Sequence, residues 1–412
     1  MSRRLLHIGC ASLFVLLTVS FHHQKQAVRL SFSSASQVVD EREDTLYQPQ
    51  NLSKFYDVLD LLVELKRDKV VITHIGDSHI QADYQTHTSR VLFQKTFGNG
   101  GRGFVFPYRL IRSNSPTNLS TSTGGLWQSC RSIISHNDCN FGLAGTTATT
   151  FDSTAFFRIN PNRLGDMNYE FNKVKLFSYQ SPLCFDLTML DGDSLALDID
   201  IQPINSTVSD IYFNRNQDSL WLAFKKLQGQ DYFQFYGLSF ENQNPGIIYN
   251  GIGQNGAFVK TYLRHQFFNE QLSMLNSDLV ILSLGTNDGY VSSSKFCKAC
   301  FKSNYRTLLN QIISKNPSVS ILLVTPNDIY IKRRYHNDNM ELISEAIYEL
   351  SDEFGTAVWD FYHLMGGSNS MTKWRSAGFA QNDLVHFTEK GYTLQGQLLY
   401  QAIMNGYERR FD

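Results

Sequence analysis

The stretch that decides the fold is VVITHIGDSH, residues 70–79. Its first six residues are mostly apolar and end at Gly76, which is typical of a short strand buried on both faces of a sheet. Apolar residues also recur at helical spacing through residues 51–67, just before this strand. The sequence therefore predicts a helix that leads into a buried strand, with the hydroxyl of Ser78 directly after the end of the strand.

The same alternation of strands and helices returns near residue 247 and continues to the C-terminus. Short apolar runs predict strands at 247–249, 279–284, 321–324 and 357–359. Helical spacing predicts helices at 260–275, 301–314, 337–354 and from about 388. Because strands that alternate with helices form a parallel sheet with helices on both faces, we expect an α/β domain.

Between these two parts the hydrophobic period changes from 3.6 to 2. Apolar residues alternate with mostly polar ones at 174–176, 195–201 and 233–235, and turn-forming residues separate these segments. We therefore expect an all-β sandwich that is inserted into the α/β domain. The expected organisation is a signal peptide or anchor at 1–21, a linker at 22–50, the two parts of the α/β domain at 51–109 and 246–412, and the β insert at 110–245.

Composition and charge exclude other classes of protein. The chain has 412 residues, enough for two or three domains, and a formal net charge of -1. Binding to phosphates needs concentrated positive charge, so we expect no nucleic-acid partner. Hydrophobic residues make up 42% of the chain, which is too many for a disordered protein.

A basic start and an apolar run open the chain. Arg3 and Arg4 precede an apolar segment that extends to Phe21, about the length of a secretory signal peptide. Small residues at 18–20 suit cleavage, so we expect removal of the segment, with retention as a membrane anchor as the alternative. The pattern predicts export.

Five cysteines follow Cys10, and their odd number argues against a complete set of disulfides. Cys130 and Cys139 are close enough in sequence to close a small loop in an oxidising compartment. Cys297 and Cys300 form one CxxC pair without a second pair or a nearby pair of histidines. We interpret them as two cysteines beside a helix start and assign no metal.

Three loops carry a reactive set of side chains. Ser78 follows the first strand, Asn287 follows the strand at 279–284, and Asp383 and His386 stand just before the last helix. Reactive groups of α/β proteins gather beyond the carboxyl ends of the strands. A serine nucleophile needs a base, a histidine has the pKa for that role, and an aspartate can orient the imidazole and stabilise its protonated form. The sequence therefore predicts a Ser78–His386–Asp383 triad for acyl transfer.

Acyl transfer also needs hydrogen-bond donors for the oxyanion, worth about 2.7–4 kcal/mol each. We assign this role to the backbone N–H of Ser78, the side-chain amide of Asn287 and a glycine N–H in the loop at 250–257. Gly256 is the first choice because it directly precedes a predicted helix, where N–H groups are unpaired. Gly253 is the alternative, and a flexible turn would also contain these glycines without any such role.

The residues named so far resemble the SGNH hydrolases, also called GDSL esterases. Four blocks carry the resemblance, in the order of that family: Gly76-Asp77-Ser78, Gly256, Gly285-Thr286-Asn287-Asp288 and Asp383-Leu384-Val385-His386. The resemblance covers about 51–109 and 246–412. It implies a flavodoxin-like, three-layer α/β/α fold and a serine nucleophile. The acyl transfer proposed for these residues needs no cofactor.

Further stretches resemble a narrower group, the bacterial peptidoglycan O-acetylesterases whose SGNH domain is interrupted by a carbohydrate-binding-like β module. These stretches are SHIQAD at 78–83, GGRGF at 100–104, YGLSFEN at 236–242 and PGIIY at 245–249. The resemblance implies an exported serine esterase of the periplasm or cell envelope. Its expected substrate is an O-acetylated cell-envelope polysaccharide, in the first place peptidoglycan.

Two other functions would use the same residues. A polysaccharide O-acetyltransferase would pass the acetyl group to a sugar hydroxyl instead of water, and a glycan-binding surface protein would keep the scaffold without catalysis.

Several polar and aromatic residues also have ordinary structural roles. Ser78 and Asp383 can cap helices, and we expect Asp77 and Asp288 to fix turns by accepting backbone N–H bonds. We expect structural roles for His74, His79, His87 and His136, and core positions rather than sugar contacts for Trp127 and Trp221.

Overall fold

The computed structural model describes residues 38–39, 44–134, 139–162, 164–180, 185–191, 194–226 and 232–410. The predicted signal peptide or anchor at 1–21 and most of the predicted linker at 22–50 lie outside the described residues, as do His136 and Cys184. Within the described part, no helix is both long and apolar enough to cross a membrane.

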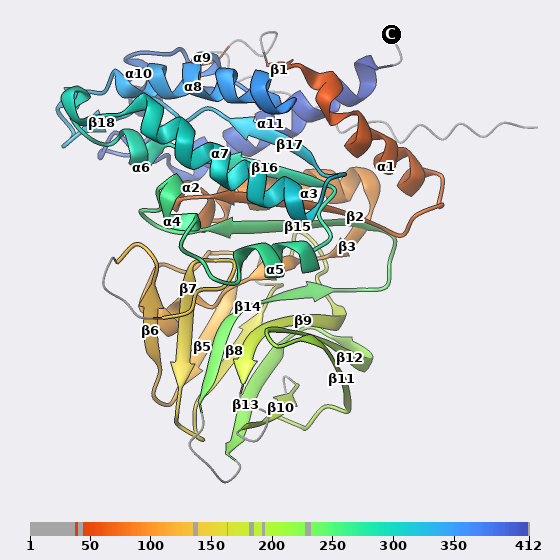
Figure 1. Cartoon of the computed structure of the whole chain (residues 1–412). Coiled ribbons are helices and arrows are strands. Elements are labelled where there is room, and N and C mark those ends of the chain that lie inside the picture. Colours follow the sequence, from red (N-terminus) through yellow and green to blue (C-terminus); the bar gives the residue numbers. More distant parts are fainter. Residues whose placement is uncertain are drawn as a thin grey trace, which may run out of the picture.

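A seven-stranded sheet forms the centre of the α/β domain (Figure 1). Its strand order is β1-β20-β17-β16-β2-β15-β3, and every neighbouring pair is parallel except β1 with β20. The parallel sheet predicted from the sequence is confirmed, whereas β1 was not predicted because it falls in the polar segment interpreted as a linker. The strands are β1 (Leu46–Tyr47), β2 (Lys69–Gly76), β3 (Asn99–Gly101), β15 (Gly246–Gly253), β16 (Leu279–Ser283), β17 (Ser320–Val324) and β20 (Ala357–Trp359).

Helices cover both faces of this sheet, because successive residues of each strand point to opposite sides. In β16, Leu279 and Ile281 pack into one core, while Val280 and Leu282 pack into the other. The first core is completed by α1 (Ser53–Val63), α3 (Tyr84–Phe97), α9 (Phe361–Leu364), α10 (Ser370–Ser376) and α11 (Glu389–Arg409). The second is completed by α4 (Val259–Tyr262), α5 (Phe268–Met274), α7 (Lys298–Lys315) and α8 (Asn339–Phe354).

Short elements connect these layers. They are η2 (Pro49–Leu52), α2 (Ser78–Gln81), η3 (Tyr108–Ile111), α6 (Thr286–Gly289), η4 (Ser293–Lys295), β18 (Tyr330–Ile331) and β19 (Tyr335–His336).

The inserted region forms two antiparallel sheets that lie below the α/β domain in Figure 1. One has the order β10-β13-β8-β5, and the other has the order β11-β12-β9-β14-β7-β6, with β4 also paired to β14. Aromatic side chains join the two sheets, since the rings of Phe157 and Phe235 lie 4.7 Å apart and those of Phe224 and Phe233 lie 4.6 Å apart. The β sandwich expected from the period-2 pattern is therefore present.

The strands of this region are β4 (Gly103–Val105), β5 (Ser120–Gly124), β6 (Gln128–Arg131), β7 (Thr146–Thr150), β8 (Phe156–Asn160), β9 (Phe171–Gln180), β10 (Phe185–Leu190), β11 (Ile199–Asn205), β12 (Val208–Gln217), β13 (Leu220–Lys226) and β14 (Phe233–Glu241).

The chain enters and leaves the insert at neighbouring points. β3 pairs with β15 in the central sheet, whereas β4 begins only two residues later and pairs with β14. β14 ends at Glu241, and β15 begins at Gly246. In this crossing Phe104 lies opposite Ser239, so two of the stretches that carry the narrower resemblance are direct neighbours.

The predicted helix at 260–275 is wrong as a continuous element. It is divided into α4 and α5, and the intervening residues bond to the insert instead. The N–H of Phe267 donates to the carbonyl of Phe141, and the N–H of Phe141 donates to the side chain of Gln266. These tertiary hydrogen bonds replace helical ones.

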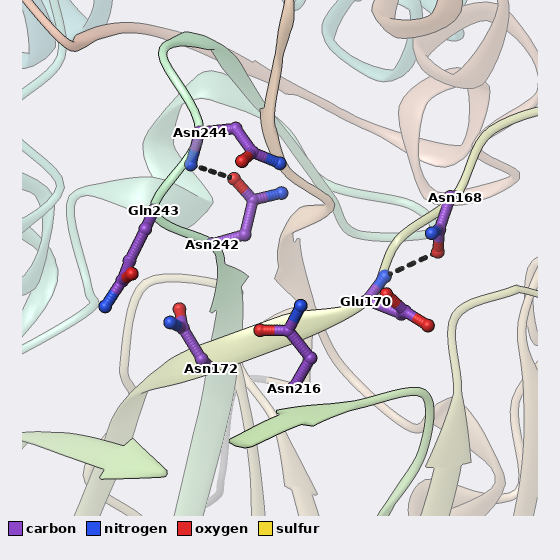
Figure 2. A pocket seen from close by; sticks show the side chains of 7 residues that line it. All are labelled: Asn168, Glu170, Asn172, Asn216, Asn242, Gln243 and Asn244. Carbon is purple, nitrogen blue, oxygen red and sulfur yellow. Dashed lines mark hydrogen bonds between the residues drawn. The ribbon is translucent and has the colours of Figure 1, made fainter. Parts of the chain in front are cut away.

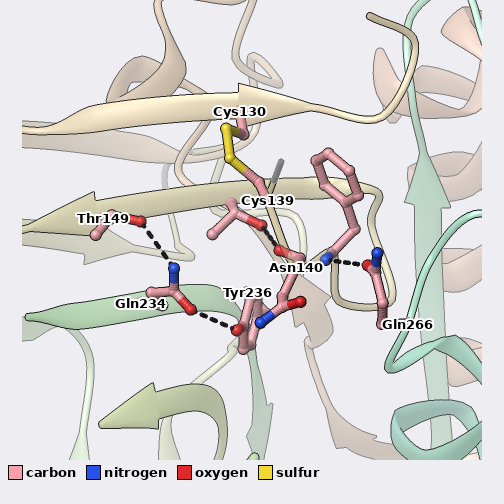
Figure 3. Close-up of a disulfide and its surroundings, with 9 residues drawn as sticks. Cys130, Cys139, Asn140, Thr149, Gln234, Tyr236 and Gln266 are labelled. Atoms are coloured by element: carbon pink, nitrogen blue, oxygen red, sulfur yellow. Dashed lines mark hydrogen bonds between the residues drawn. A yellow bond between two sulfur atoms is a disulfide. The ribbon is translucent and has the colours of Figure 1, made fainter. Parts of the chain in front are cut away.

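Two disulfides lie in the described part of the chain. Cys130 and Cys139 are joined, as the sequence suggested, and close a loop beside β6 and β7 (Figure 3). Cys297 and Cys300 lie at the start of a helix, as expected, and are joined by a disulfide that was not predicted. Cys297 is the N-cap of α7, and its sulfur accepts a hydrogen bond from the N–H of Cys300.

The central strands should dominate the stability of the α/β domain. We expect Leu282→Ala, at a side chain with 0% exposure in β16, to lower the free energy of unfolding by about 2–5 kcal/mol because it leaves a cavity. The matched control, Leu342→Ala, alters a side chain with 38% exposure in α8. It should change the free energy of unfolding by less than about 0.5 kcal/mol. Urea unfolding measures both, and equal effects would contradict this assignment of the core.

Candidate active site

The loops that carry the predicted site begin at the same level of the central sheet. β2 lies between β15 and β16, and Gly76 at its end is in register with Gly253 on one side and Ser283 on the other. Ser78, Gly256 and Asn287 each follow one of these three strands within a few residues. Parallel pairing therefore gathers the first three sequence blocks at one edge of the sheet.

Ser78, His386 and Asp383 form a continuous hydrogen-bonded chain. The Oγ of Ser78 lies 2.9 Å from Nε2 of His386, and Nδ1 of His386 lies 2.7 Å from Oδ2 of Asp383. The side chains of His386 and Asp383 are 34% and 29% exposed, so these hydrogen-bonded residues are partly accessible to solvent. This geometry allows the imidazole to take a proton from the serine while the carboxylate stabilises the charged ring.

A tight turn lets Asp383 reach a ring only three residues away. Oδ1 of Asp383 accepts hydrogen bonds from the N–H groups of Val385 and His386, both at 3.0 Å, which leaves Oδ2 for the imidazole. Leu384 has a left-handed backbone with φ of 58°, a conformation that costs about 1–3 kcal/mol for a residue other than glycine. The buried side chain of Leu384 anchors the turn in the core beneath α11.

The pKa values of the pair are shifted in opposite directions. Burial alone would raise the pKa of Asp383, but the hydrogen bonds from His386 and Val385 outweigh it and hold that pKa well below its usual range. Burial would lower the pKa of His386, but its hydrogen bond and charge interaction with Asp383 outweigh burial and raise it. Asp383 is therefore ionised when His386 accepts a proton.

Residues 254–257 form a turn that we call the 254–257 turn. The N–H of Ala257 donates to the carbonyl of Gln254 at 3.0 Å and closes the turn. Gly256 has φ of 78°, the value that the third position of a type II turn requires and that favours glycine. Among the described residues, the N–H of Gly256 has no hydrogen-bond acceptor, so it is available to a bound oxyanion.

The side-chain amide of Asn287 joins the first three blocks. Its Nδ2 donates to Oδ2 of Asp77 at 3.2 Å and to the carbonyl of Ala257 at 3.0 Å. Asn287 therefore lies between the residue before Ser78 and the residue after Gly256. The next residue, Asp288, binds the start of α4, because Oδ2 of Asp288 accepts the N–H of Val259.

The alternative glycine, Gly253, has a packing role. A Cβ atom at this position would lie 2.1 Å from the backbone nitrogen of Gln81. The missing side chain lets the backbone of α2, which begins with Ser78, lie directly against β15.

The other polar residues singled out from the sequence support this edge of the sheet. Oδ1 of Asp77 accepts the N–H of His79, as predicted, and burial raises the pKa of Asp77 to about 6. His74 is buried between the hydroxyls of Tyr249 and Ser283, and burial lowers its pKa to about 3.

His79 lies beside the triad. Its Nδ1 is 2.9 Å from the hydroxyl of Tyr392, and its ring centre is 5.1 Å from that of His386. Burial holds the pKa of His79 well below its usual range, so the ring is neutral. His87 lies on the next helix, with its Nε2 2.7 Å from Oδ2 of Asp166.

The two tryptophans pack within the insert. Trp127 contacts Phe157 and Phe224, and Trp221 contacts Phe156 and the guanidinium of Arg158.

Two glutamines of the site were assigned no role from the sequence. Gln81 on α2 accepts the N–H of Asn255 at 2.8 Å, and Gln254 opens the 254–257 turn. Gln81 stands in the SHIQAD stretch, but the sequence contains no signal for its partner, which is 174 residues away.

A polar pocket of about 130 Å³ lies at the other end of the central sheet (Figure 2). Part of its wall directly precedes β15, whereas the 254–257 turn follows β15, so a strand of eight residues, about 25 Å long, separates pocket and triad. The pocket contains none of the predicted catalytic residues. It is lined by Asn168, Glu170, Asn172, Asn216, Asn242, Gln243 and Asn244.

Comparison with known proteins supports the family resemblance. Residues 220–394 match the GDSL-like Lipase/Acylhydrolase family, a segment that begins within the insert and does not include Ser78. No curated protein matched the chain in the sequence comparison.

The fold matches the solved structure of an esterase, and two further solved structures are similar to a lesser degree. A peptidoglycan O-acetylesterase matches with a TM-score of 0.72 and 21% identity, over 86% of this chain and 96% of its own. A lipase/acylhydrolase from Enterococcus faecalis has a TM-score of 0.32 and 23% identity, over 39% of this chain and 77% of its own. A family two carbohydrate esterase from Cellvibrio japonicus has a TM-score of 0.29 and 10% identity, over 70% of this chain and 99% of its own.

The fold and the family match together show that the chain resembles the SGNH hydrolases. Over most of its length the chain resembles, in particular, the peptidoglycan O-acetylesterase, whose fold it shares. At 21% identity this structural match establishes the fold alone. The substrate has to be argued from the site.

The protonation of His386 should depend on Asp383. We expect the pKa of His386, followed by NMR titration of its ring, to lie above the usual value of a histidine and to fall in Asp383→Asn, because the negative charge that favours the imidazolium is lost. The matched control is Asp360→Asn, which changes another aspartate that contacts a histidine three residues later, His363. A titration of His386 that responds equally to both substitutions would contradict the pairing.

Proposed function

We propose that the protein is an exported serine esterase that removes O-acetyl groups from a cell-envelope polysaccharide, in the first place peptidoglycan. The observation that carries this proposal is the unbroken chain of hydrogen bonds from Ser78 Oγ through the His386 ring to Asp383. The fold shared with a peptidoglycan O-acetylesterase favours this class of substrate.

In the first step, Ser78 Oγ attacks the carbonyl carbon of the acetyl ester while Nε2 of His386 takes the proton of the hydroxyl. The carbonyl oxygen becomes an oxyanion. The N–H groups of Ser78 and Gly256 and the amide of Asn287 are the proposed donors to it. In the free protein the amide of Asn287 already donates to Asp77 and Ala257, so in this mechanism it shares one of its hydrogens with the oxyanion.

The tetrahedral intermediate then collapses. The bond between the carbonyl carbon and the sugar oxygen breaks, and the sugar leaves as an alcohol with the proton from His386. Ser78 is left as an acetyl ester. Water, deprotonated by His386, attacks this ester, and a second collapse releases acetate and returns the proton to Ser78.

Two features fit a substrate outside the cytoplasm. Disulfides persist in oxidising compartments, and the described part of the chain contains two of them. The triad is partly exposed, which suits an ester carried on a large polymer. We also propose that residues 110–245 act as a carbohydrate-binding-like module within the SGNH domain, as the resemblance implies.

The test is release of acetate from O-acetylated peptidoglycan by the purified protein. We expect Ser78→Ala to lower the rate by on the order of 10⁴-fold or more, because the nucleophile is absent, while the circular dichroism spectrum stays unchanged. The matched control is Ser314→Ala, at an exposed serine of α7 whose hydroxyl donates to the carbonyl of Gln311. Acetate release that persists in Ser78→Ala would refute the mechanism.

Product analysis separates this function from its alternatives. An esterase releases free acetate whether or not a glycan acceptor is present, whereas an acetyltransferase moves the acetyl group to the acceptor. A non-catalytic glycan-binding protein would not be labelled at Ser78 by a serine-directed phosphonate.

A further inference from the structure

We propose that the β insert holds the 254–257 turn in its catalytic position, with Gln81 and Gln254 as the positioning residues. The inference rests on the proposed function, because the turn matters through the N–H of Gly256. It assigns the insert a part in the chemistry, in addition to any part in binding glycan.

Gln254 ties the start of the turn to the insert. Its Oε1 accepts a hydrogen bond from the hydroxyl of Ser132 at 2.9 Å, and its Nε2 donates to the carbonyl of Gly145 at 2.7 Å. Ser132 and Gly145 are themselves joined, since the N–H of Ser132 donates to the carbonyl of Gly145. Ser132 lies within the loop closed by the Cys130–Cys139 disulfide, and Gly145 follows Cys139 by six residues.

Gln81 ties the middle of the turn to a second segment of the insert. Its Oε1 accepts the N–H of Asn255 at 2.8 Å. Its Nε2 donates to the hydroxyl of Ser113 at 3.1 Å and to the carbonyl of Asn114 at 3.3 Å. Because Gln81 stands three residues after Ser78 on α2, one side chain bridges the nucleophile helix, the turn and the insert.

These contacts hold three of the four residues of the turn. Gln254 and Asn255 are held as described, and Asn287 holds the carbonyl of Ala257. The N–H of Gly256 is the group left without an acceptor among the described residues. A misplacement of about 1 Å in a catalytic group can cost about 10²-fold in rate, so the anchors that fix this N–H should control kcat.

The test uses Gln81→Met, which keeps the size of the side chain but removes all three hydrogen bonds. With 4-nitrophenyl acetate as the substrate, we expect kcat to fall about 10- to 100-fold and KM to stay within about twofold of the wild-type value. The reason is that an oxyanion donor acts in the transition state and contributes little to substrate binding.

Gln81→Glu is the rescue variant. Its carboxyl group keeps an acceptor for the N–H of Asn255 but loses donors to the insert, so we expect a kcat clearly above that of Gln81→Met. Equal values of kcat for the two variants would overturn the role of Gln81 as an acceptor for the turn.

Gln94→Met is the matched control. Gln94 is as buried as Gln81, with exposures of 2% and 5%, and its Nε2 donates to the carbonyls of Gly101 and Ile247. It therefore ties the opposite end of β15 into the fold, away from the turn. We expect a loss of thermal stability comparable to that of Gln81→Met, with kcat unchanged.

The outcomes separate this inference from the proposed function. A wild-type protein without esterase activity overturns both. An active wild type with an unimpaired Gln81→Met, or with an equally impaired Gln94→Met, overturns the inference alone. If Gln81→Met does not fold, Ser132→Ala makes the same test from the insert side, because it removes the hydroxyl that donates to Oε1 of Gln254. An unchanged kcat in Ser132→Ala then overturns the inference.

Discussion

Parallel pairing of β2 with β15 on one side and β16 on the other puts the ends of three strands in one row. Ser78, the 254–257 turn and Asn287 each lie just after one of these strand ends. His386 and Asp383 are added from a separate turn, whose geometry depends on Asp383 accepting the backbone N–H groups of its own loop. The site is therefore assembled by two features, the register of β2 with its neighbours and the turn that contains Asp383 and His386.

A buried ionic cluster lies at the start of α3, just after α2. Asp83 accepts hydrogen bonds from Arg90, Arg102 and Asn118, and all four residues are buried. Burial alone would raise the pKa of Asp83, but the two guanidinium groups outweigh it and hold that pKa far below its usual range. Removing one member of such a cluster leaves an uncompensated buried charge, which is strongly destabilising. The cluster thus links the N-cap of α3, two residues after α2, to residues on both sides of the start of the insert.

The sequence predicted the elements whose signal is local. Short apolar runs revealed the central strands, and the four blocks revealed the residues that the structure brings together as Ser78, His386 and Asp383. The helix α3 was not predicted, because its buried residues include the polar Gln85, Arg90 and Gln94 and therefore leave no apolar stripe. Arg90 and Gln94 donate to the distant carbonyls of Tyr249 and Ile247. The division between α4 and α5 depends on Phe141, and the role of Gln81 depends on Asn255. Such effects arise from tertiary contacts, which hydrophobic period and spacing do not encode.

The strand order has a further consequence for how the chain is made. About 170 residues separate the end of β2 from the start of β15, and β16 follows later still. At a synthesis rate of about 5–20 residues per second, β2 emerges roughly 10–30 s before either of its neighbours exists. During that interval both of its edges lack their final partners, although α1 and α3 can already pack on one of its faces, so this interior strand reaches its final pairing only after most of the polypeptide has been synthesised.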